Sequence, residues 1–82
     1  MDKLDYAILD SMANAYQAIS DMRSTTRKRI SLKLNAKGSD TIYRRLIKLI
    51  NKGYVKKGIP EGREHTYYVT PDGIKALKEA SK

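Results

Sequence analysis

All seven glycines and prolines of this chain lie at residue 38 or later, and this uneven placement constrains the fold more than any other feature. Residues 1–36 contain neither type, so helix is the default structure of that part. Glycine or proline then recurs every few residues, which is typical of short elements joined by turns. The sequence therefore predicts helices first and a turn-rich ribbon later.

The first helix is predicted over about residues 2–19, and it carries two apolar stripes on roughly opposite sides. Whether residues 14–23 continue this helix or form a loop or a short strand stays open. One stripe consists of Leu4, Ile8, Met12, Ala15 and Ile19. The other consists of Tyr6, Leu9, Ala13 and Tyr16. A surplus apolar face on a short chain favours a partner surface, so we expect the second stripe to form a homodimer contact. The alternative is that the helix packs between two neighbours of the same molecule.

Two more helices are predicted around the first glycine. One begins near Ser20 or Ser24, which are both suitable N-caps, and runs to about residue 34. The other has Ser39 as its N-cap and ends at about residue 51, where Gly53 can serve as the left-handed residue after the helix. Its buried side is predicted to contain Ile42, Leu46, Leu49 and Ile50.

The segment 54–70 predicts a β-hairpin, because two stretches rich in β-branched and aromatic residues flank "PEGR". Period-two alternation places Val55, Tyr67 and Val69 inward and Arg63 near the tip. A last helix is predicted over 71–81, with Thr70 as its N-cap.

Charge is concentrated in the middle of the chain. Residues 23–58 carry twelve Lys and Arg against one Asp, a net +11, whereas residues 1–22 carry a net −3 and residues 59–82 are balanced. Such a basic block is expected of a protein that binds a polyanion. The alternative is a solvated surface that only keeps the protein soluble.

Several classes of function are excluded. The chain has no cysteine and one histidine, His65, so neither a metal site nor a cofactor site is expected. No nucleophile beside a base and no phosphate-binding glycine loop is present, so we predict that the protein is not an enzyme. No membrane span or signal peptide is found, which favours a cytoplasmic protein.

The stretches "TIYRRLIKLINKGYV" and "GREHTYYVTPDGIKAL" resemble the small winged helix-turn-helix transcriptional regulators, most closely the PadR-like and MarR-like DNA-binding domains. The resemblance implies a mainly α fold with a small β-hairpin wing (α+β), in a single domain over 1–82 with its helix-turn-helix at about 24–51. In this family the position of Gly73 lets the last helix approach the sheet closely.

A winged helix-turn-helix places its third predicted helix in the DNA major groove, where Arg44 is the first candidate for a base contact. Arg63 would reach the minor groove from the wing. We expect Asp40 to cap its helix, and Arg45 to lie nearer the core with its stem on apolar surface. The complete set of predicted DNA-binding residues is Arg27, Lys28, Lys37, Ser39, Thr41, Tyr43, Arg44, Lys48 and Arg63.

The predicted function is sequence-specific binding of double-stranded DNA by a transcriptional regulator, a dimeric repressor associated with the nucleoid. One alternative is a nucleic-acid binder without regulatory function, such as a plasmid partition or replication accessory or an RNA-binding winged helix. Another is a winged helix that binds protein only, which the +11 block argues against. The operator and any small-molecule effector stay open.

Overall fold

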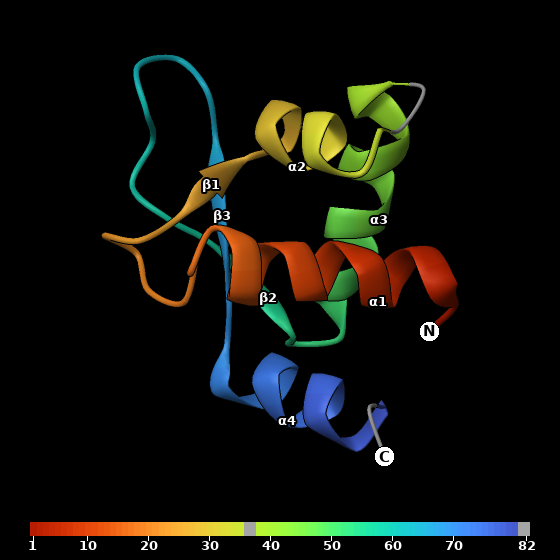
Figure 1. Cartoon of the computed structure of the whole chain (residues 1–82). Helices are drawn as coiled ribbons and strands as arrows, with labels where there is room; N and C mark the ends of the chain where they lie inside the picture. Colours follow the sequence, from red (N-terminus) through yellow and green to blue (C-terminus); the bar gives the residue numbers. More distant parts are fainter. Residues whose placement is uncertain (36–37, 81–82) are drawn as a thin grey trace.

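The computed structural model describes residues 1–35 and 38–80, and it has helices packed around a small antiparallel sheet (Figure 1). In chain order the elements are α1 (Lys3–Asp10), a π-helical turn η1 (Ser11–Ala15), β1 (Thr25–Thr26), α2 (Arg27–Lys33), α3 (Ser39–Asn51), β2 (Val55–Lys57), β3 (Thr66–Val69) and α4 (Pro71–Ala80). A helix pair followed by a two-stranded wing is the winged helix-turn-helix that the sequence predicted.

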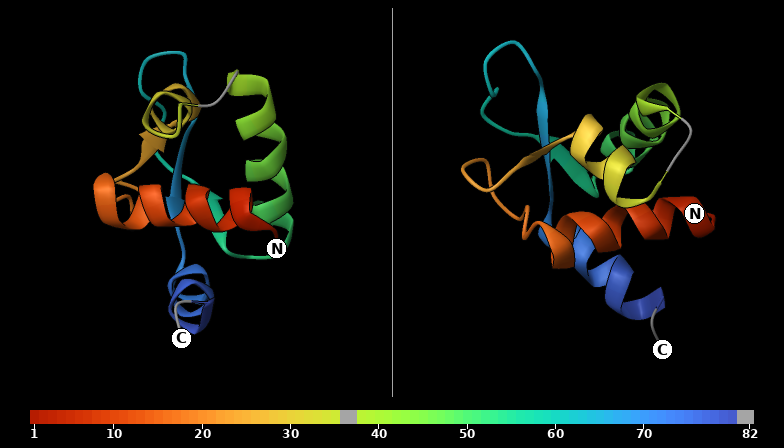
Figure 2. Two further views of the ribbon diagram at one scale, coloured as in Figure 1. Left: turned by 45° about the vertical axis from the view of Figure 1, so that its right-hand side comes forward. Right: turned by 45° about the horizontal axis from the view of Figure 1, so that its top comes forward.

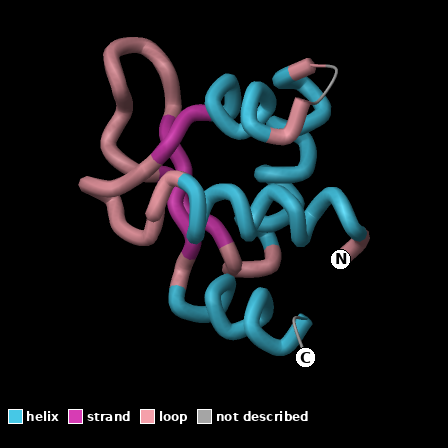
Figure 3. The backbone as a smooth tube through the Cα atoms, viewed as in Figure 1, coloured by secondary structure: helices cyan, strands magenta, loops and turns pink. Residues whose placement is uncertain are grey.

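The sheet has β3 in the centre, with β1 on one side and β2 on the other, both antiparallel to it (Figure 3). The sequence predicted β2 and β3 but not β1, because two consecutive threonines show no periodicity. Thr25 pairs with Tyr67. Thr26 is also the N-cap of α2, since its hydroxyl accepts the Arg29 N–H at 3.3 Å. β1 therefore ties the start of the helix-turn-helix to the wing.

The core lies between the sheet and the first three helices, and α1 crosses α3 steeply (Figure 2). The inward positions predicted for α3 and the wing are confirmed, except that Ile50 is only partly buried. Six of those residues are at most 1% exposed: Ile42, Leu46, Leu49, Val55, Tyr67 and Val69. Their burial fixes which side of α3 faces outward.

The first helix is shorter than predicted. Asp2 caps α1 in a capping box with Asp5, but the α-helix ends at residue 10 and widens into the π-helical turn η1. Gln17 then adopts a positive φ of 51°, which ends the helical path. Ala18 is buried, and its carbonyl accepts the N–H of Val69 at 2.7 Å, so the segment after η1 is attached to the end of β3.

The prediction that Leu9 belongs to an exposed dimer stripe is wrong, because Leu9 is completely buried in the core. Ala13 and Tyr16 are partly buried against that core, and the Tyr16 hydroxyl donates to the Arg29 carbonyl at 2.8 Å. In the other stripe, Ile19 is 49% exposed and Ala15 is exposed as well. A helix packed between the sheet, α3 and α4 buries residues of both stripes, Ile8 and Met12 of one and Leu9 of the other, which agrees with the alternative interpretation.

The boundaries of the helix-turn-helix differ in detail from the prediction. α2 begins at Arg27 rather than near Ser20 or Ser24, because β1 occupies the intervening residues. In α3 the N-cap is Gly38, and Ser39 is the first helical residue. Gly53 has a φ of 81°, as expected of the residue that ends α3.

The close approach of α4 to the wing is confirmed. Thr70 caps α4 by accepting the Gly73 N–H at 3.1 Å, and its own hydroxyl donates to the Gly53 carbonyl at 2.6 Å. A Cβ at Gly73 would lie 2.3 Å from the Tyr54 carbonyl oxygen, so only glycine fits here.

Candidate nucleic-acid interface

The outward face of α3 carries the residues that the sequence singled out for base recognition. Asp40, Thr41, Tyr43 and Arg44 are all exposed, on the side of the helix away from the core. Within residues 1–35 and 38–80, Arg44 forms no ion pair, so its guanidinium is available to an incoming ligand. Asp40 lies in the first turn of α3, where its negative charge interacts favourably with the helix dipole. The predicted cap is not formed by a side-chain hydrogen bond to the residues described at this end of α3.

Tyr43 and Arg27 form one unit. The Arg27 guanidinium carbon lies 4.9 Å from the centroid of the Tyr43 ring, a cation–π contact between α2 and α3. Tyr43 is 36% exposed, so the ring supports the arginine without being withdrawn from solvent. The contact holds two of the predicted DNA-binding side chains next to each other.

The wing ends in a tight turn that presents Arg63. The backbone of Glu61 and Glu64 is joined by two hydrogen bonds, of 3.0 and 3.1 Å, around the two residues between them. Gly62 has a φ of 63°, and glycine at the first position of such a two-residue turn matches a type II′ hairpin. Arg63 is exposed at the tip, as predicted.

Two ion pairs hold the wing against α2, and we call them the wing latch. Glu61 accepts two hydrogen bonds of 2.8 Å from the Arg29 guanidinium, and Glu64 lies 3.3 Å from the Lys28 ammonium. All four side chains are between 46% and 71% exposed. Lys28, a predicted phosphate contact, thus already has an anionic partner.

A cleft of about 530 Å³ separates the wing from α2 and α3. It is lined by Thr26, Arg27, Lys28, Tyr43, Arg63, Glu64, His65 and Tyr67. The lining contains three cationic side chains and one carboxylate, a net charge of +2 if His65 is counted as neutral. The cleft therefore favours binding of an anion. Burial raises the pKa of Tyr67, so its hydroxyl stays protonated.

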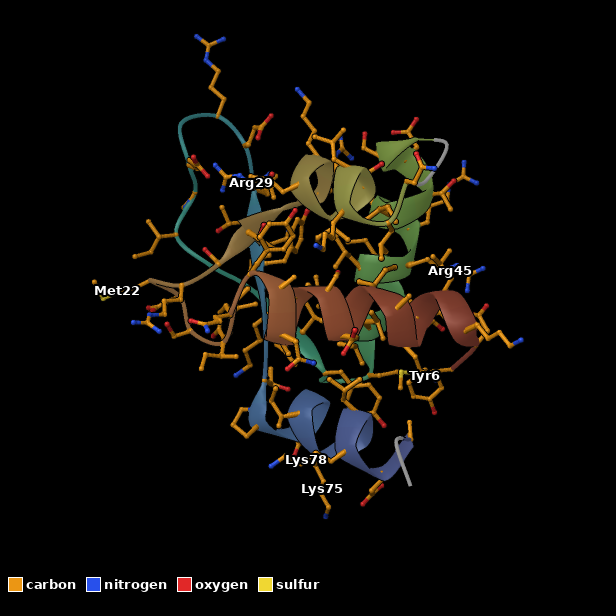
Figure 4. The ribbon with its side chains drawn as sticks, viewed as in Figure 1. Tyr6, Met22, Arg29, Arg45, Lys75 and Lys78 are labelled. Atoms are coloured by element: carbon orange, nitrogen blue, oxygen red, sulfur yellow. The ribbon has the colours of Figure 1, made fainter. Side chains whose placement is uncertain are left out.

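At the other side of the helix-turn-helix, the N-terminus of α1 holds two cations of α3, and we call this group the α1 clamp. Arg45 donates to the carboxylate of Asp2 and lies 3.4 Å from that of Asp5. Lys48 lies 3.6 Å from Asp5, which is completely buried. The Arg45 hydrogen bond is the main reason why the pKa of Asp2 is lowered to about 2. Figure 4 shows Arg29 on the wing side and Arg45 beside α1.

The predicted DNA-binding residues thus differ in their location and in their ion pairs. Arg27, Tyr43, Arg44 and Arg63 lie on or around the cleft and the outward face of α3. Lys28 and Lys48 are partly neutralised by acids, and Lys37 lies outside the described residues. Ser39 is half-buried in the first turn of α3. Four acids that pair with these cations were not predicted from the sequence: Asp2, Asp5, Glu61 and Glu64. Their partners are 32 to 43 residues away along the chain, so no local spacing indicates the pairs.

Other kinds of site find no support in the described part of the chain. No group of three or more side chains is arranged to hold a metal ion across these residues. No helix among them is both long and apolar enough to cross a membrane.

Comparison with known proteins agrees with this architecture. No protein-family model matches the chain. The DNA-binding protein TubR of a Clostridium botulinum C phage is 31% identical over 78 residues, which cover 95% of this chain and 94% of TubR. The solution structure of the DNA-binding TubR fragment from Clostridium botulinum matches with a TM-score of 0.76 at 30% identity, over 98% of this chain and 96% of that one.

More distant structures share the fold. A mutant of MepR from S. aureus matches with a TM-score of 0.80 at 17% identity, over 96% of this chain and 54% of that one. The oxidised form of MarR from E. coli matches with a TM-score of 0.73 at 22% identity, over 99% and 52%. These structures confirm that the chain shares the winged helix-turn-helix fold of the MarR-like regulators, as predicted. Similarity to the DNA-binding protein TubR agrees with the prediction that the chain is not an enzyme. Identity and coverage on both sides show that the chain belongs to the family of the DNA-binding protein TubR.

Proposed function

We propose that this protein binds double-stranded DNA sequence-specifically, as a homodimer that represses transcription, and that residues 1–82 act as one winged helix-turn-helix domain in the cytoplasm, on the nucleoid. The observation that carries the proposal is the cationic cleft that Arg27 of α2 and Arg63 of the wing line together with Tyr43 of α3. Arg44, the next residue of α3, is exposed on the outward face of that helix. The related TubR is itself named a DNA-binding protein.

In this proposal α3 enters the major groove. Arg44 donates in a bidentate way to guanine, while Thr41 and Tyr43 contact neighbouring bases or phosphates. Backbone N–H groups around Ser39 face a phosphate at the N-terminus of α3, and Lys48 contributes a weaker phosphate contact because Asp5 shares its charge. Arg63 enters the adjacent minor groove, where narrow A·T tracts attract arginine.

The cleft has a defined place in this arrangement. In this arrangement α3 occupies the major groove and the wing tip occupies the next minor groove. The sugar-phosphate strand that separates the two grooves then has to pass between α3 and the wing. Arg27, Lys28 and His65 line that passage. A phosphate there would compete with Glu64 for Lys28, which is 3.3 Å from it in the free protein. The strand therefore binds where the wing latch now closes.

Selection of bound sequences from random duplex DNA tests the proposal. A dimeric repressor should enrich a palindromic site with half-sites one helical turn apart, or a multiple of it, and prefer it over random duplex by at least about a thousandfold. Binding of selected and random DNA with similar affinity would instead support a non-regulatory DNA binder, such as a partition accessory. Failure to bind any duplex would contradict the proposal.

A further inference from the structure

Tyr67 of β3 has a buried ring and a polar end that reaches the cleft between the wing, α2 and α3. The residue is 1% exposed and is part of the core, yet it also lines the cleft. It lies in the central strand of the sheet, opposite Thr25 of β1 and Lys57 of β2 (Figure 3). Because the ring is enclosed, the hydroxyl at its outer end is the part of the side chain that can meet a ligand in the cleft.

The Tyr67 hydroxyl has no hydrogen-bond partner among residues 1–35 and 38–80, whereas the Tyr16 hydroxyl donates to the Arg29 carbonyl at 2.8 Å. In the same part of the chain, the Thr25 hydroxyl is the one buried side-chain group that lacks both a partner and contact with solvent. The Tyr67 oxygen is therefore in contact with solvent, and this contact lies in the cleft. Its O–H is free to donate to a group that enters from outside.

The groups next to this hydroxyl suit an anionic ligand. The Arg27 guanidinium lies over the Tyr43 ring, 4.9 Å from its centroid, and both residues line the cleft with Tyr67. Burial is the main cause of the raised pKa of Tyr67, while Tyr43 raises this pKa further and Arg27 lowers it. Arg27 and Tyr43 thus both lie close to the hydroxyl, which stays a hydrogen-bond donor at neutral pH.

We propose that the Tyr67 hydroxyl and the Arg27 guanidinium together hold one phosphate of the DNA backbone at the floor of the cleft, an inference that rests on the proposed function and adds a residue to it. Both donors are held in place: the core fixes the Tyr67 ring, and the Tyr43 ring supports Arg27. Donors that are already ordered lose little conformational entropy on binding. Hydrogen bonds from them to a charged oxygen are stronger than those between neutral groups.

The size and the rim of the cleft favour a strand over a free phosphate ion, which has the same chemistry. The volume of about 530 Å³ is within the range of about 300–1,000 Å³ that small-ligand sites occupy, so a phosphodiester group can enter. At the rim Lys28 and Arg63 are exposed and extend the cationic lining beyond the reach of one phosphate. These two side chains can meet the neighbouring phosphates of a strand that continues past the wing.

Tyr67→Phe tests the site, because it removes the donor and leaves the ring in the core. The hydroxyl has no partner within the described residues, so the fold should persist, and thermal unfolding checks this. Affinity for random duplex DNA should fall roughly tenfold, since one hydrogen bond to a charged group is lost. The salt dependence should stay unchanged because no charge is removed, whereas Arg27→Ala should flatten it by about one counterion.

Tyr68→Phe is the matched control. Tyr68 is the next residue of β3, so its side chain lies on the opposite face of the sheet, and it does not line the cleft. Deletion of its hydroxyl should leave the affinity for DNA unchanged, as measured by filter binding over a salt series. If Tyr67→Phe binds duplex as tightly as Tyr68→Phe does, the phosphate site is overturned, while DNA binding by the chain stands.

Titration with inorganic phosphate separates this inference from the proposed function. The chain has one histidine, His65, and it lines the cleft, so its ring signal in NMR spectra reports on the cleft alone. At constant pH and ionic strength, phosphate should shift this signal in wild type with a dissociation constant at least about threefold lower than in Tyr67→Phe. That result in a protein that binds no duplex would uphold the site and contradict the proposed function. In such a protein, equal shifts in both or a shift in neither would overturn the site as well.

Discussion

The wing latch and the α1 clamp use the same chemistry at the two sides of the helix-turn-helix, and they differ in burial. In both, two acids from outside the basic block pair with two cations inside it. The acids of the wing latch, Glu61 and Glu64, are about half exposed, whereas Asp5 of the α1 clamp is completely buried. Exposed ion pairs contribute little to stability and exchange partners easily, and buried charges are costly to leave unpaired. The α1 clamp should therefore fix α3 in place, and the wing latch should open for DNA.

The largest expected effect of breaking either group is on stability, through Asp5. Asp5→Ala removes the buried partner of Arg45 and Lys48 and half of the α1 capping box, so it should lower the free energy of unfolding by about 3 kcal/mol. Urea denaturation followed by circular dichroism measures this. Asp21→Ala, an exposed loop carboxylate, is the control and should change stability by less than about 0.5 kcal/mol. Equal effects of the two would mean that the α1 clamp is no more structural than an ordinary surface charge.

The next effect is on DNA binding, through the wing latch. The double variant Glu61→Gln, Glu64→Gln should change the free energy of unfolding by no more than about 1 kcal/mol. Its affinity for random duplex should rise, with a salt dependence steeper by roughly one to two counterions, because Arg29 and Lys28 no longer exchange a carboxylate for a phosphate. Filter binding over a salt series measures both quantities.

The matched control for the wing latch is Asp72→Asn, Glu79→Gln on α4, which removes the same charge at a distance from the wing. An equal rise in affinity for this control would show that net charge, and not release of the wing latch, is responsible. If the free energy of unfolding of the Glu61→Gln, Glu64→Gln variant fell by several kcal/mol, the wing latch would be needed for stability too.

The smallest effect is a pH dependence within the α1 clamp. A native pKa of about 2 means that the stability supplied by Asp2 is fully present above its unfolded pKa, about 4, and is lost as the pH falls through about 2. Asn can still cap α1, so Asp2→Asn isolates the charge. The stability difference between wild type and Asp2→Asn should be constant between about pH 7 and pH 5, should shrink as the pH falls toward about 2 and should vanish only below it. A difference of unchanged size at about pH 2 would mean that the Arg45 ion pair is not its source.

Much of the fold could be predicted from local signals. The apolar spacing of α3, the left-handed Gly53, the "PEGR" turn and the Thr70 cap each specify one element through neighbouring residues alone, and each agrees with the structure. β1 was not predicted, since its two residues acquire their conformation from pairing with β3. The end of α1 was left open over residues 14–23, because neither the left-handed Gln17 nor the π-helical turn has a local sequence signal.

The candidate site could be predicted as a list of residues but not as an arrangement. Outward exposure of Arg44 and the tip position of Arg63 follow from periodicity and turn chemistry. The burial of Leu9 could not be predicted in this way. The spacing of apolar residues does not tell which of two apolar faces packs against another part of the molecule. The pairing of Arg45 with Asp2 joins residues 43 apart, and only the crossing of α1 over α3 brings them together.

The central claim is that the outward face of α3 reads base pairs, and Arg44→Ala tests it most directly. The measurement is the ratio of affinities for the selected site and for random duplex, taken at one salt concentration for wild type, Arg44→Ala and Lys28→Ala. Loss of a bidentate contact predicts that Arg44→Ala weakens binding to the selected site by about 1–3 kcal/mol and reduces the ratio, with preference relaxed at one base pair. Lys28→Ala should weaken binding to both DNAs equally and leave the ratio unchanged. If Arg44→Ala also weakens both equally, Arg44 contacts phosphate, and the claim that α3 reads sequence through this residue is contradicted.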